Sequence, residues 1–154
     1  MEIKINKLQQ DDVKKFIELI RVFEIVFEMK NSKMPPQMYL EQLLKRDDFF
    51  VFVATFDGEV VGGLTSYIMH QYYSEMPLVY IYDLAVNTKW QRNGIGKMLI
   101  AENNKYCKSI HVEVVMVQAD EVDDYAIEFY HSTGATGQKV IHFDYIIHEA
   151  KQSY

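Results

Sequence analysis

Cysteine, proline and long apolar runs are all scarce in this chain of 154 residues. The single cysteine, Cys107, excludes an intramolecular disulfide framework, and we expect a structural thiol because free cysteine is readily buried. No apolar run approaches the roughly 18 residues that a membrane helix needs, and residues 1–5 lack the apolar core of a signal peptide. These absences predict a cytoplasmic protein with no membrane partner.

An excess of positive charge is also missing. The chain has 16 Lys and Arg residues against 22 Asp and Glu residues, which gives a formal net charge of −6. Nucleic acid is therefore not expected as a partner, because phosphate backbones require clustered Lys and Arg. A cationic substrate is compatible with this charge. The five histidines are scattered without metal-ligand spacing, so no metal site is predicted.

The length suits one domain with a sizeable core, and no repeat or linker divides residues 1–154. Hydrophobic periodicity and turn signals predict an α+β domain in the order β-α-α-β-β-β-α-β-α-β. We expect strands over residues 2–6, 49–56, 59–69, 80–86, 112–119 and 140–147, with the fifth central because it is almost continuously apolar. Four helices are predicted. The first begins after Asp12, the second covers residues 37–45, the third begins after Gly94 and the fourth ends before Gly134.

Residues 80–97 hold the most informative pattern in the chain. An apolar run rich in β-branched and aromatic residues is typical of a buried strand, and Gly94 and Gly96 then precede a segment with helical spacing. A strand, a glycine turn and a helix together present free backbone N–H groups at the positive end of a helix. This arrangement predicts a phosphate-binding site.

Two nucleotide-binding motifs do not explain this site. A Walker-type loop requires Ser or Thr directly after Gly-Lys, whereas Met98 follows Gly96 and Lys97. A dinucleotide fingerprint requires a third glycine at position 99, which is Leu99. The sequence therefore favours another phosphate-bearing ligand.

Residues 91–96 fit the pattern Gln/Arg-x-x-Gly-x-Gly/Ala, which resembles the pyrophosphate loop of the GNAT superfamily of N-acetyltransferases. A second family segment, Asn-x-x-Ala-x-x-Phe/Leu-Tyr-x-x-x-Gly-Phe, resembles residues 123–135. There Ala126, Phe129, Tyr130 and Gly134 match, while Asp123 replaces Asn and Ala135 replaces Phe. The resemblance implies the GNAT fold, a mixed and mainly antiparallel sheet with helices on both faces, and acetyl-CoA as co-substrate.

Four shorter segments, residues 80–86, 117–120, 123–124 and 142–144, are similar to aminoglycoside 3-N-acetyltransferases of the first type. This resemblance implies acetyl transfer to the 3-amino group of an aminoglycoside, antibiotic resistance and a homodimer. Two alternatives stay open. In the first, the acceptor is a different amine, such as a diamine, an amino acid or a protein N-terminus. In the second, the chain is a non-catalytic acyl-CoA-binding module.

The resemblance also implies which residues contact the co-substrate. The backbone of residues 84–86 pairs with the pantetheine arm, and the amides of residues 91–97 bind the pyrophosphate, since glycine allows a close approach to the backbone. The predicted cofactor-binding residues are Leu84, Ala85, Val86, Gln91, Arg92, Asn93, Gly94, Ile95, Gly96, Lys97, Ala126 and Phe129.

Three residues are candidates for catalysis. Asp83 is the predicted general base, because a carboxylate in an apolar strand is costly without a partner or a chemical role; a buried cap or salt-bridge partner is the other interpretation. Asp120 is the alternative base or an ammonium anchor. The resemblance makes Tyr130 the general acid, against a core tyrosine. The predicted substrate-binding residues are Glu75, Tyr80, Tyr82, Asp123, Asp124 and Asp144.

Overall fold

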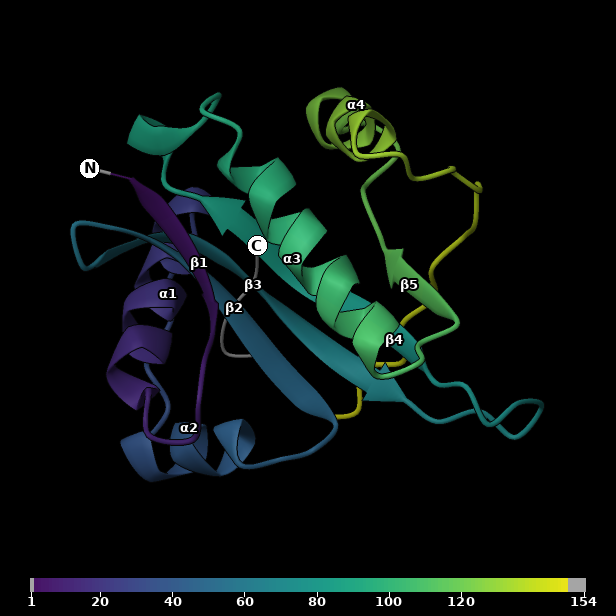
Figure 1. Ribbon diagram of the computed structural model, residues 1–154, viewed down its shortest axis with the longest axis horizontal. Helices are drawn as coiled ribbons and strands as arrows, with labels where there is room; N and C mark the ends of the chain where they lie inside the picture. The colour runs from purple at the N-terminus through teal and green to yellow at the C-terminus, as the bar shows by residue number, and fades with distance from the viewer. Residues whose placement is uncertain (1, 150–154) are drawn as a thin grey trace.

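A computed structural model describes residues 2–149 of the protein (Figure 1). Its strands and helices follow the predicted order up to the fourth α-helix. The elements are β1 (Ile3–Lys7), α1 (Val13–Val26), α2 (Gln37–Leu44), β2 (Phe49–Phe56), β3 (Glu59–Met69), β4 (Leu78–Val86), the 3₁₀ helix η1 (Thr88–Trp90), α3 (Ile95–Ser109), β5 (Val114–Val117) and α4 (Asp124–Ser132).

The strands form one sheet in the order β1-β2-β3-β4-β5. All neighbours are antiparallel except β4 and β5, which are parallel, so the predicted mixed and mainly antiparallel sheet is confirmed. Helices cover both faces of this sheet (Figure 1). Along β2, Val51 packs in the core under α1 and α2, whereas Phe52 packs in the core under α3. Burial on both faces explains why β2 is apolar at every position except Thr55.

Turns and glycines set the register of β2, β3 and β4. Asp57 and Gly58 both have positive φ, 53° and 86°, as a type I′ hairpin turn requires. A Cβ on Gly62 would lie 2.8 Å from the Ala85 carbonyl oxygen, and one on Gly63 would lie 2.6 Å from the Phe52 carbonyl oxygen. Both positions therefore require glycine, because neighbouring backbone leaves no room for a Cβ.

A buried polar pair fixes α3 on the sheet. The Ser66 hydroxyl donates a hydrogen bond of 2.9 Å to Asn103 Oδ1, and both side chains are inaccessible to solvent. Cys107 lies one helical turn further along α3 and is also buried. Burial raises the pKa of the Cys107 thiol to about 11, so the thiol stays protonated near neutral pH and acts as a packing group.

Two predictions about the end of the sheet are wrong. The fifth strand is shorter than residues 112–119 and lies at the edge, because no described strand pairs with its outer side; Val114 and Met116 are accordingly 48% and 37% exposed. Residues 140–147 form no strand, since a β-strand needs a neighbour for its backbone hydrogen bonds and this segment has none within residues 2–149.

Residues 2–149 contain neither a membrane-spanning helix nor a cluster of metal-binding side chains. No helix within residues 2–149 is long and apolar enough to cross a membrane. In the same part of the chain, no group of three or more His, Cys, Asp or Glu side chains is placed to hold a metal ion.

Candidate active site

The sheet opens between β4 and β5. Their parallel pairing runs from Leu78 opposite Val114 to Ile81 opposite Val117, and it ends there because the chain leaves β5 for α4. Beyond this point residues 83–86 pair with β3 alone among the described strands. One edge of β4 therefore presents unpaired backbone N–H and C=O groups, which an extended ligand can bind as an added strand.

The loop before α3 lies at the end of this open edge. Gln91 Nε2 donates a hydrogen bond of 2.9 Å to the Val86 carbonyl oxygen, which ties the loop to the last residue of β4. Asn93 Nδ2 donates to the carbonyl oxygens of Trp90 and Gln91, each at 3.0 Å. Gly94 precedes α3 with φ +78°. The first N–H groups of α3 have no acceptor within the helix, so they are available to an anion.

The two segments that resemble the family motifs meet in space. A Cβ on Gly96 would lie 2.9 Å from two ring carbons of Phe129, so only glycine allows α4 to approach the start of α3 this closely. The Arg92 guanidinium lies 5.4 Å from the centroid of the Tyr125 ring. At the start of α4, Asp123 accepts a hydrogen bond of 3.0 Å from the Ala126 N–H. The helix that carries Tyr130 is thus fixed against the phosphate loop.

Asp83 lies where β4 is irregular. Thr65 of β3 pairs with Asp83 and Ser66 pairs with Ile81, so Tyr82 is an extra residue in a β-bulge. Successive strand residues normally point to opposite faces, but Tyr82 and Asp83 both line the same pocket. Burial raises the pKa of Asp83 from 3.8 to about 6.

The Asp83 carboxylate has no ion pair and no hydrogen-bond partner among residues 2–149. This does not fit the interpretation of Asp83 as a buried cap or a salt-bridge partner. A half-buried carboxylate that titrates near pH 6, is largely ionised at neutral pH and is open to a pocket is suited to accept a proton.

Tyr130 lies on the other side of the opening, on α4. Its ring packs against the core under α3 and contacts Phe129 at 5.1 Å between ring centroids. Burial, followed by the charges of Asp123 and Asp83, raises the pKa of Tyr130 to about 12. The hydroxyl is therefore protonated throughout the neutral range and can donate a proton or a hydrogen bond.

A pocket of about 210 Å³ adjoins Asp83 on the α1 side of the sheet. Aromatic rings form part of its wall, with Tyr67 contacting Tyr82 at 5.9 Å and Phe49 at 5.0 Å between centroids. Glu24 of α1 also lines the pocket and accepts a hydrogen bond of 2.8 Å from Ser32. The pocket thus combines aromatic faces with two carboxylates and one lysine, Lys33, and this net negative lining suits a cationic molecule.

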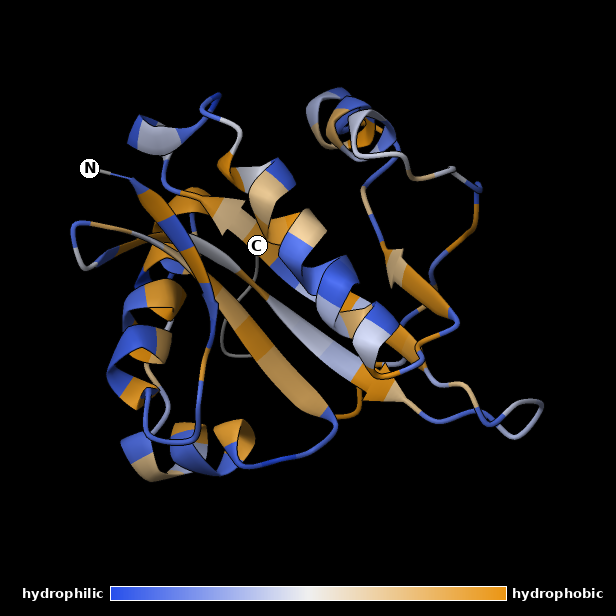
Figure 2. Cartoon of the chain, in the orientation of Figure 1, coloured by the Kyte–Doolittle hydropathy of each residue, from blue (hydrophilic) through white to orange (hydrophobic). Residues whose placement is uncertain are grey.

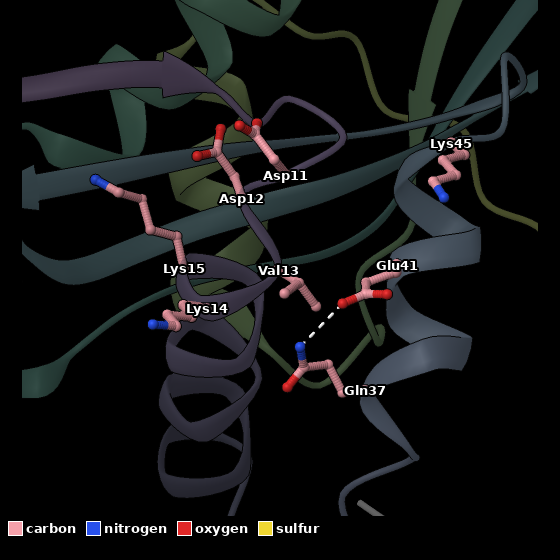
Figure 3. Close-up of a pocket in the computed structure, with 8 residues that line it drawn as sticks. All are labelled: Asp11, Asp12, Val13, Lys14, Lys15, Gln37, Glu41 and Lys45. Carbon is pink, nitrogen blue, oxygen red and sulfur yellow. Dashed lines mark hydrogen bonds between the residues drawn. The ribbon is translucent and has the colours of Figure 1, made fainter.

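A larger hollow of about 600 Å³ lies between the start of α1 and α2 (Figure 3). Its lining mixes Asp11, Asp12, Lys14, Lys15 and Lys45 with the Gln37–Glu41 pair, which is hydrogen-bonded at 2.9 Å. None of these residues belongs to β4, to the phosphate loop or to α4. The smaller pocket is therefore the candidate acceptor site, because it alone of the two includes Asp83.

The other sequence-predicted residues do not line this pocket. Tyr80 contacts its wall: the Tyr80 ring lies 6.1 Å from the Tyr82 ring between centroids, and the Tyr80 hydroxyl donates a hydrogen bond of 3.1 Å to Gln118. Asp144 instead pairs with His142 at 2.8 Å on an exposed segment. Four further predicted residues are exposed and do not line the pocket: Glu75, Asp120, Asp123 and Asp124.

Sequence reasoning did not find Glu24, Tyr67 or the other pocket residues of α1, α2 and β3. Helices α1 and α2 wall one side of this pocket. The missed residues carry no local motif and come together only through the packing of α1 on the sheet. An aromatic or acidic residue on an apolar helix face or strand was the one available signal.

Comparison with known proteins gives the same picture over nearly the whole chain. Residues 15–135 match the acetyltransferase (GNAT) family. The crystal structure of the aminoglycoside acetyltransferase meta-AAC0020, from an uncultured soil metagenomic sample and in complex with sisomicin, is 52% identical and covers 95% of this chain and 97% of its own, with a TM-score of 0.93.

More distant solved structures share the fold. An aminoglycoside acetyltransferase HMB0005, also from an uncultured soil metagenomic sample, is 29% identical, covers 96% of this chain and 100% of its own, and has a TM-score of 0.88. AAC(6')-Iy in complex with a bisubstrate analogue is 16% identical, covers 94% of this chain and 99% of its own, and has a TM-score of 0.78.

Proposed function

The chain belongs to the GNAT family of acetyltransferases, and we propose that it transfers the acetyl group of acetyl-CoA to the 3-amino group of an aminoglycoside. The observation that carries the proposal is the open edge of β4 with Asp83 beside it, facing a pocket lined by aromatic and acidic side chains. Support for the acceptor comes from the 52% identity to an aminoglycoside acetyltransferase crystallised with sisomicin.

The residues present fit acetyl-CoA as the co-substrate. The unpaired backbone of residues 84–86 suits an extended amide-containing arm, and the first turn of α3 suits a pyrophosphate. Arg92 and Lys97 are exposed beside that turn and add positive charge. Gly96 leaves no side chain between α3 and Phe129, so α4 packs directly against the start of α3.

Proton transfer in this proposal begins at Asp83. An aminoglycoside amine is largely protonated near neutral pH and must lose a proton before it attacks a thioester carbon. Asp83 accepts this proton, directly or through water, and its pKa of about 6 keeps the carboxylate ionised at neutral pH. A backbone N–H on the open edge of β4 stabilises the negative charge that develops on the carbonyl oxygen.

Tyr130 completes the proton transfers. As the new C–N bond forms and the C–S bond breaks, the Tyr130 hydroxyl donates its proton to the departing thiolate, and the products are the N-acetylated amine and the free coenzyme thiol. A pKa of about 12 keeps this proton on Tyr130 until the thiolate develops. The two half-buried groups therefore have opposite roles, base and acid, on the two sides of the opening.

The acceptor pocket supports a cationic substrate. Asp83 and Glu24 supply negative charge, and Tyr67 and Tyr82 supply aromatic faces for cation–π contact. We also infer a homodimer, for which the support is the exposed apolar segment after α4.

A panel of amines tests the proposed function directly. Purified protein is mixed with acetyl-CoA and, in turn, sisomicin, a diamine, an amino acid or a peptide with a free N-terminus, and thiol release is measured. The expected result is release with sisomicin far above the other amines, with one acetyl group found at the 3-amino nitrogen by mass spectrometry and NMR. Thiol release with a different amine, but not with sisomicin, would show that this other amine is the acceptor. Coenzyme binding without thiol release in the presence of any amine would indicate an acyl-CoA-binding module.

A further inference from the structure

Thr65 lies in the middle of β3, where polar residues interrupt an apolar strand. Figure 2 shows this part of β3 as a pale stretch beside the orange of β2. The next residue, Ser66, hydrogen-bonds to Asn103 of α3, so Thr65 points to the opposite face of the sheet, toward α1. There it lines the acceptor pocket and is only 7% exposed.

The Thr65 hydroxyl has no hydrogen-bond partner within residues 2–149, although every fully covered side-chain nitrogen or oxygen atom of these residues has one. The Thr65 oxygen is therefore not fully covered, and the pocket is the space to which it opens. Leaving a hydroxyl at this depth without a hydrogen bond costs free energy, so we expect it to bond to a molecule inside the pocket.

Thr65 lies directly opposite Asp83 in the sheet. The two residues are partners in the β3–β4 register, next to the bulge at Tyr82, and both line the pocket. Side chains opposed in this way in an antiparallel pair have Cβ atoms about 4.5–5.5 Å apart. Thr65 and Asp83 form no hydrogen bond with each other, and at this spacing one water molecule can bridge a hydroxyl and a carboxylate.

The position of β3 keeps Thr65 away from the reacting atoms. β3 lies on the side of β4 that is opposite to the open edge. Neighbouring strands are about 4.8 Å apart, so Thr65 lies roughly 10 Å from a coenzyme arm that is added to this edge. The amine that attacks the thioester lies beside that arm. Thr65 therefore acts on the reaction through Asp83 and not by contact with the amine or the thioester.

We propose that Thr65 is a positioning residue for the general base: its hydroxyl holds a water molecule that donates a hydrogen bond to one oxygen of the Asp83 carboxylate. This inference rests on the proposed function, in which Asp83 is the base. The second carboxylate oxygen is then turned toward the amine at the open edge of β4. After acetyl transfer the same water takes the proton from Asp83 and passes it to solvent, which returns the carboxylate to its ionised form.

Other charged and titratable groups surround Asp83, but none of those within residues 2–149 is hydrogen-bonded or ion-paired to it. They come from α1, the loop after α1, α2, β3, β4 and α4: Glu24, Lys33, Tyr39, Tyr67, Tyr80, Tyr82 and Tyr130. Burial is the cause of the raised pKa of Asp83. A hydrogen bond to the ionised carboxylate opposes this effect, so removing the Thr65 hydroxyl should raise the pKa of Asp83 further.

Carbon NMR of the side-chain carboxyl groups tests this link in the full-length chain without acetyl transfer, and the loss of one resonance in Asp83→Asn identifies Asp83. Thr65→Val keeps the shape of the side chain and suits a strand, whereas Thr65→Ser keeps the hydroxyl. Thr55→Val is the control, because Thr55 is equally buried but does not line the pocket. The pKa of Asp83 should rise by about 0.5 to 1 in Thr65→Val and by less than about 0.2 in the other two variants. An unchanged pKa in Thr65→Val, or the same rise in all three variants, would overturn the proposal.

Steady-state kinetics with sisomicin separates a positioning role from acceptor binding. Thr65→Val should lower kcat about 10-fold, the effect of losing one hydrogen bond to a charged group, and should leave the KM for sisomicin nearly unchanged. In the Asp83→Asn background the same substitution should lower kcat less than about 2-fold, because the ionised carboxylate is already absent. A raised KM with an unchanged kcat would overturn the proposal and make Thr65 a direct contact of the acceptor.

Acetyl transfer by the wild type distinguishes this inference from the proposed function. If the wild type acetylates sisomicin but the pKa of Asp83 does not respond to Thr65→Val, the inference fails and the function stands. If the wild type acetylates no amine while the pKa of Asp83 rises in Thr65→Val alone, the link between Thr65 and Asp83 stands and the proposed function fails.

Discussion

The ring of Phe129 fills the space where a side chain at Gly96 would begin, with two ring carbons 2.9 Å from the position of a Cβ. This contact joins the start of α3 to the middle of α4. It therefore couples the phosphate loop to the helix that carries Tyr130, the neighbour of Phe129. Glycine at position 96 therefore helps to position both the phosphate loop and Tyr130 in the proposed co-substrate site.

Gly96→Ala should weaken coenzyme binding. The added methyl group forces the Phe129 ring to move, and overpacking of this kind costs about 1–3 kcal/mol, or roughly 5-fold or more in the dissociation constant of coenzyme A. Isothermal titration calorimetry measures the change. Adding Phe129→Leu to the variant should restore most of the affinity. In an open helix Gly→Ala stabilises by about 1 kcal/mol, so a more stable variant with unchanged affinity would show that the contact has no role.

Asp83→Asn should stabilise the protein in a pH-dependent way. Burial raises the folded-state pKa of Asp83 above its ordinary value of 3.8, to about 6. Between these values the folded protein retains a proton that the unfolded chain releases, so the stability of the wild type falls as the pH rises through this window. The gain in the variant should be absent below pH 4 and about 1–2 kcal/mol above pH 7, allowing for solvent screening.

Urea unfolding at pH 3.8 and pH 7.5 measures this difference. Asp47→Asn is the matched control, because Asp47 is exposed in the turn before β2. An equal effect of Asp83→Asn at both pH values would contradict the assigned pKa.

Tyr130→Phe should slow acetyl transfer without loosening the site. The ring still packs against Phe129, but the proton donor is lost, so kcat should fall about 100-fold or more while the KM for acetyl-CoA changes little. Steady-state kinetics at saturating amine give both values. Tyr125→Phe removes a hydroxyl from the exposed side of the same helix and should leave kcat unchanged. A normal kcat in Tyr130→Phe would indicate a tyrosine that serves packing alone.

Glu24→Gln should weaken the binding of the acceptor. Glu24 lines the pocket that holds Asp83, and losing one charge-assisted hydrogen bond to an ammonium group costs about 1.5 kcal/mol or more, which is roughly 10-fold in the KM for sisomicin. The effect should shrink at high salt. Glu28→Gln is the control, since Glu28 is exposed and does not line the pocket. Equal increases in KM would show that the net charge of the protein, and not the position of Glu24 in the pocket, determines acceptor binding.

The sequence predicts most of the fold because its signals are local. β2 and β3 begin and end at the predicted residues, since Asp57 and Gly58 fix the turn between two apolar runs. β5 was misplaced because apolar composition does not show whether a strand has one neighbour or two. That depends on residues 140–147, which within residues 2–149 pair with no strand.

The candidate site also has one part that the sequence predicts and another that it does not. Asp83 and the phosphate loop lie within one continuous motif, so their proximity follows from the strand and the turn between them. The pocket does not, because Glu24 and Tyr67 lie far apart in the chain and meet only when α1 packs on the sheet. The β-bulge at Tyr82 also has no local signal, since Tyr82 is an ordinary strand residue.

The pH dependence of kcat/KM for acetyl transfer to sisomicin tests the central claim, that Asp83 is the general base, most directly. We expect the wild-type value to rise through an apparent pKa near 6 and then level off, because Asp83 must be ionised to accept a proton. In Asp83→Asn the limb near pH 6 should vanish, and kcat/KM at pH 7.5 should fall about 100-fold or more. An Asp83→Asn variant with the wild-type rate and the same limb would contradict the account.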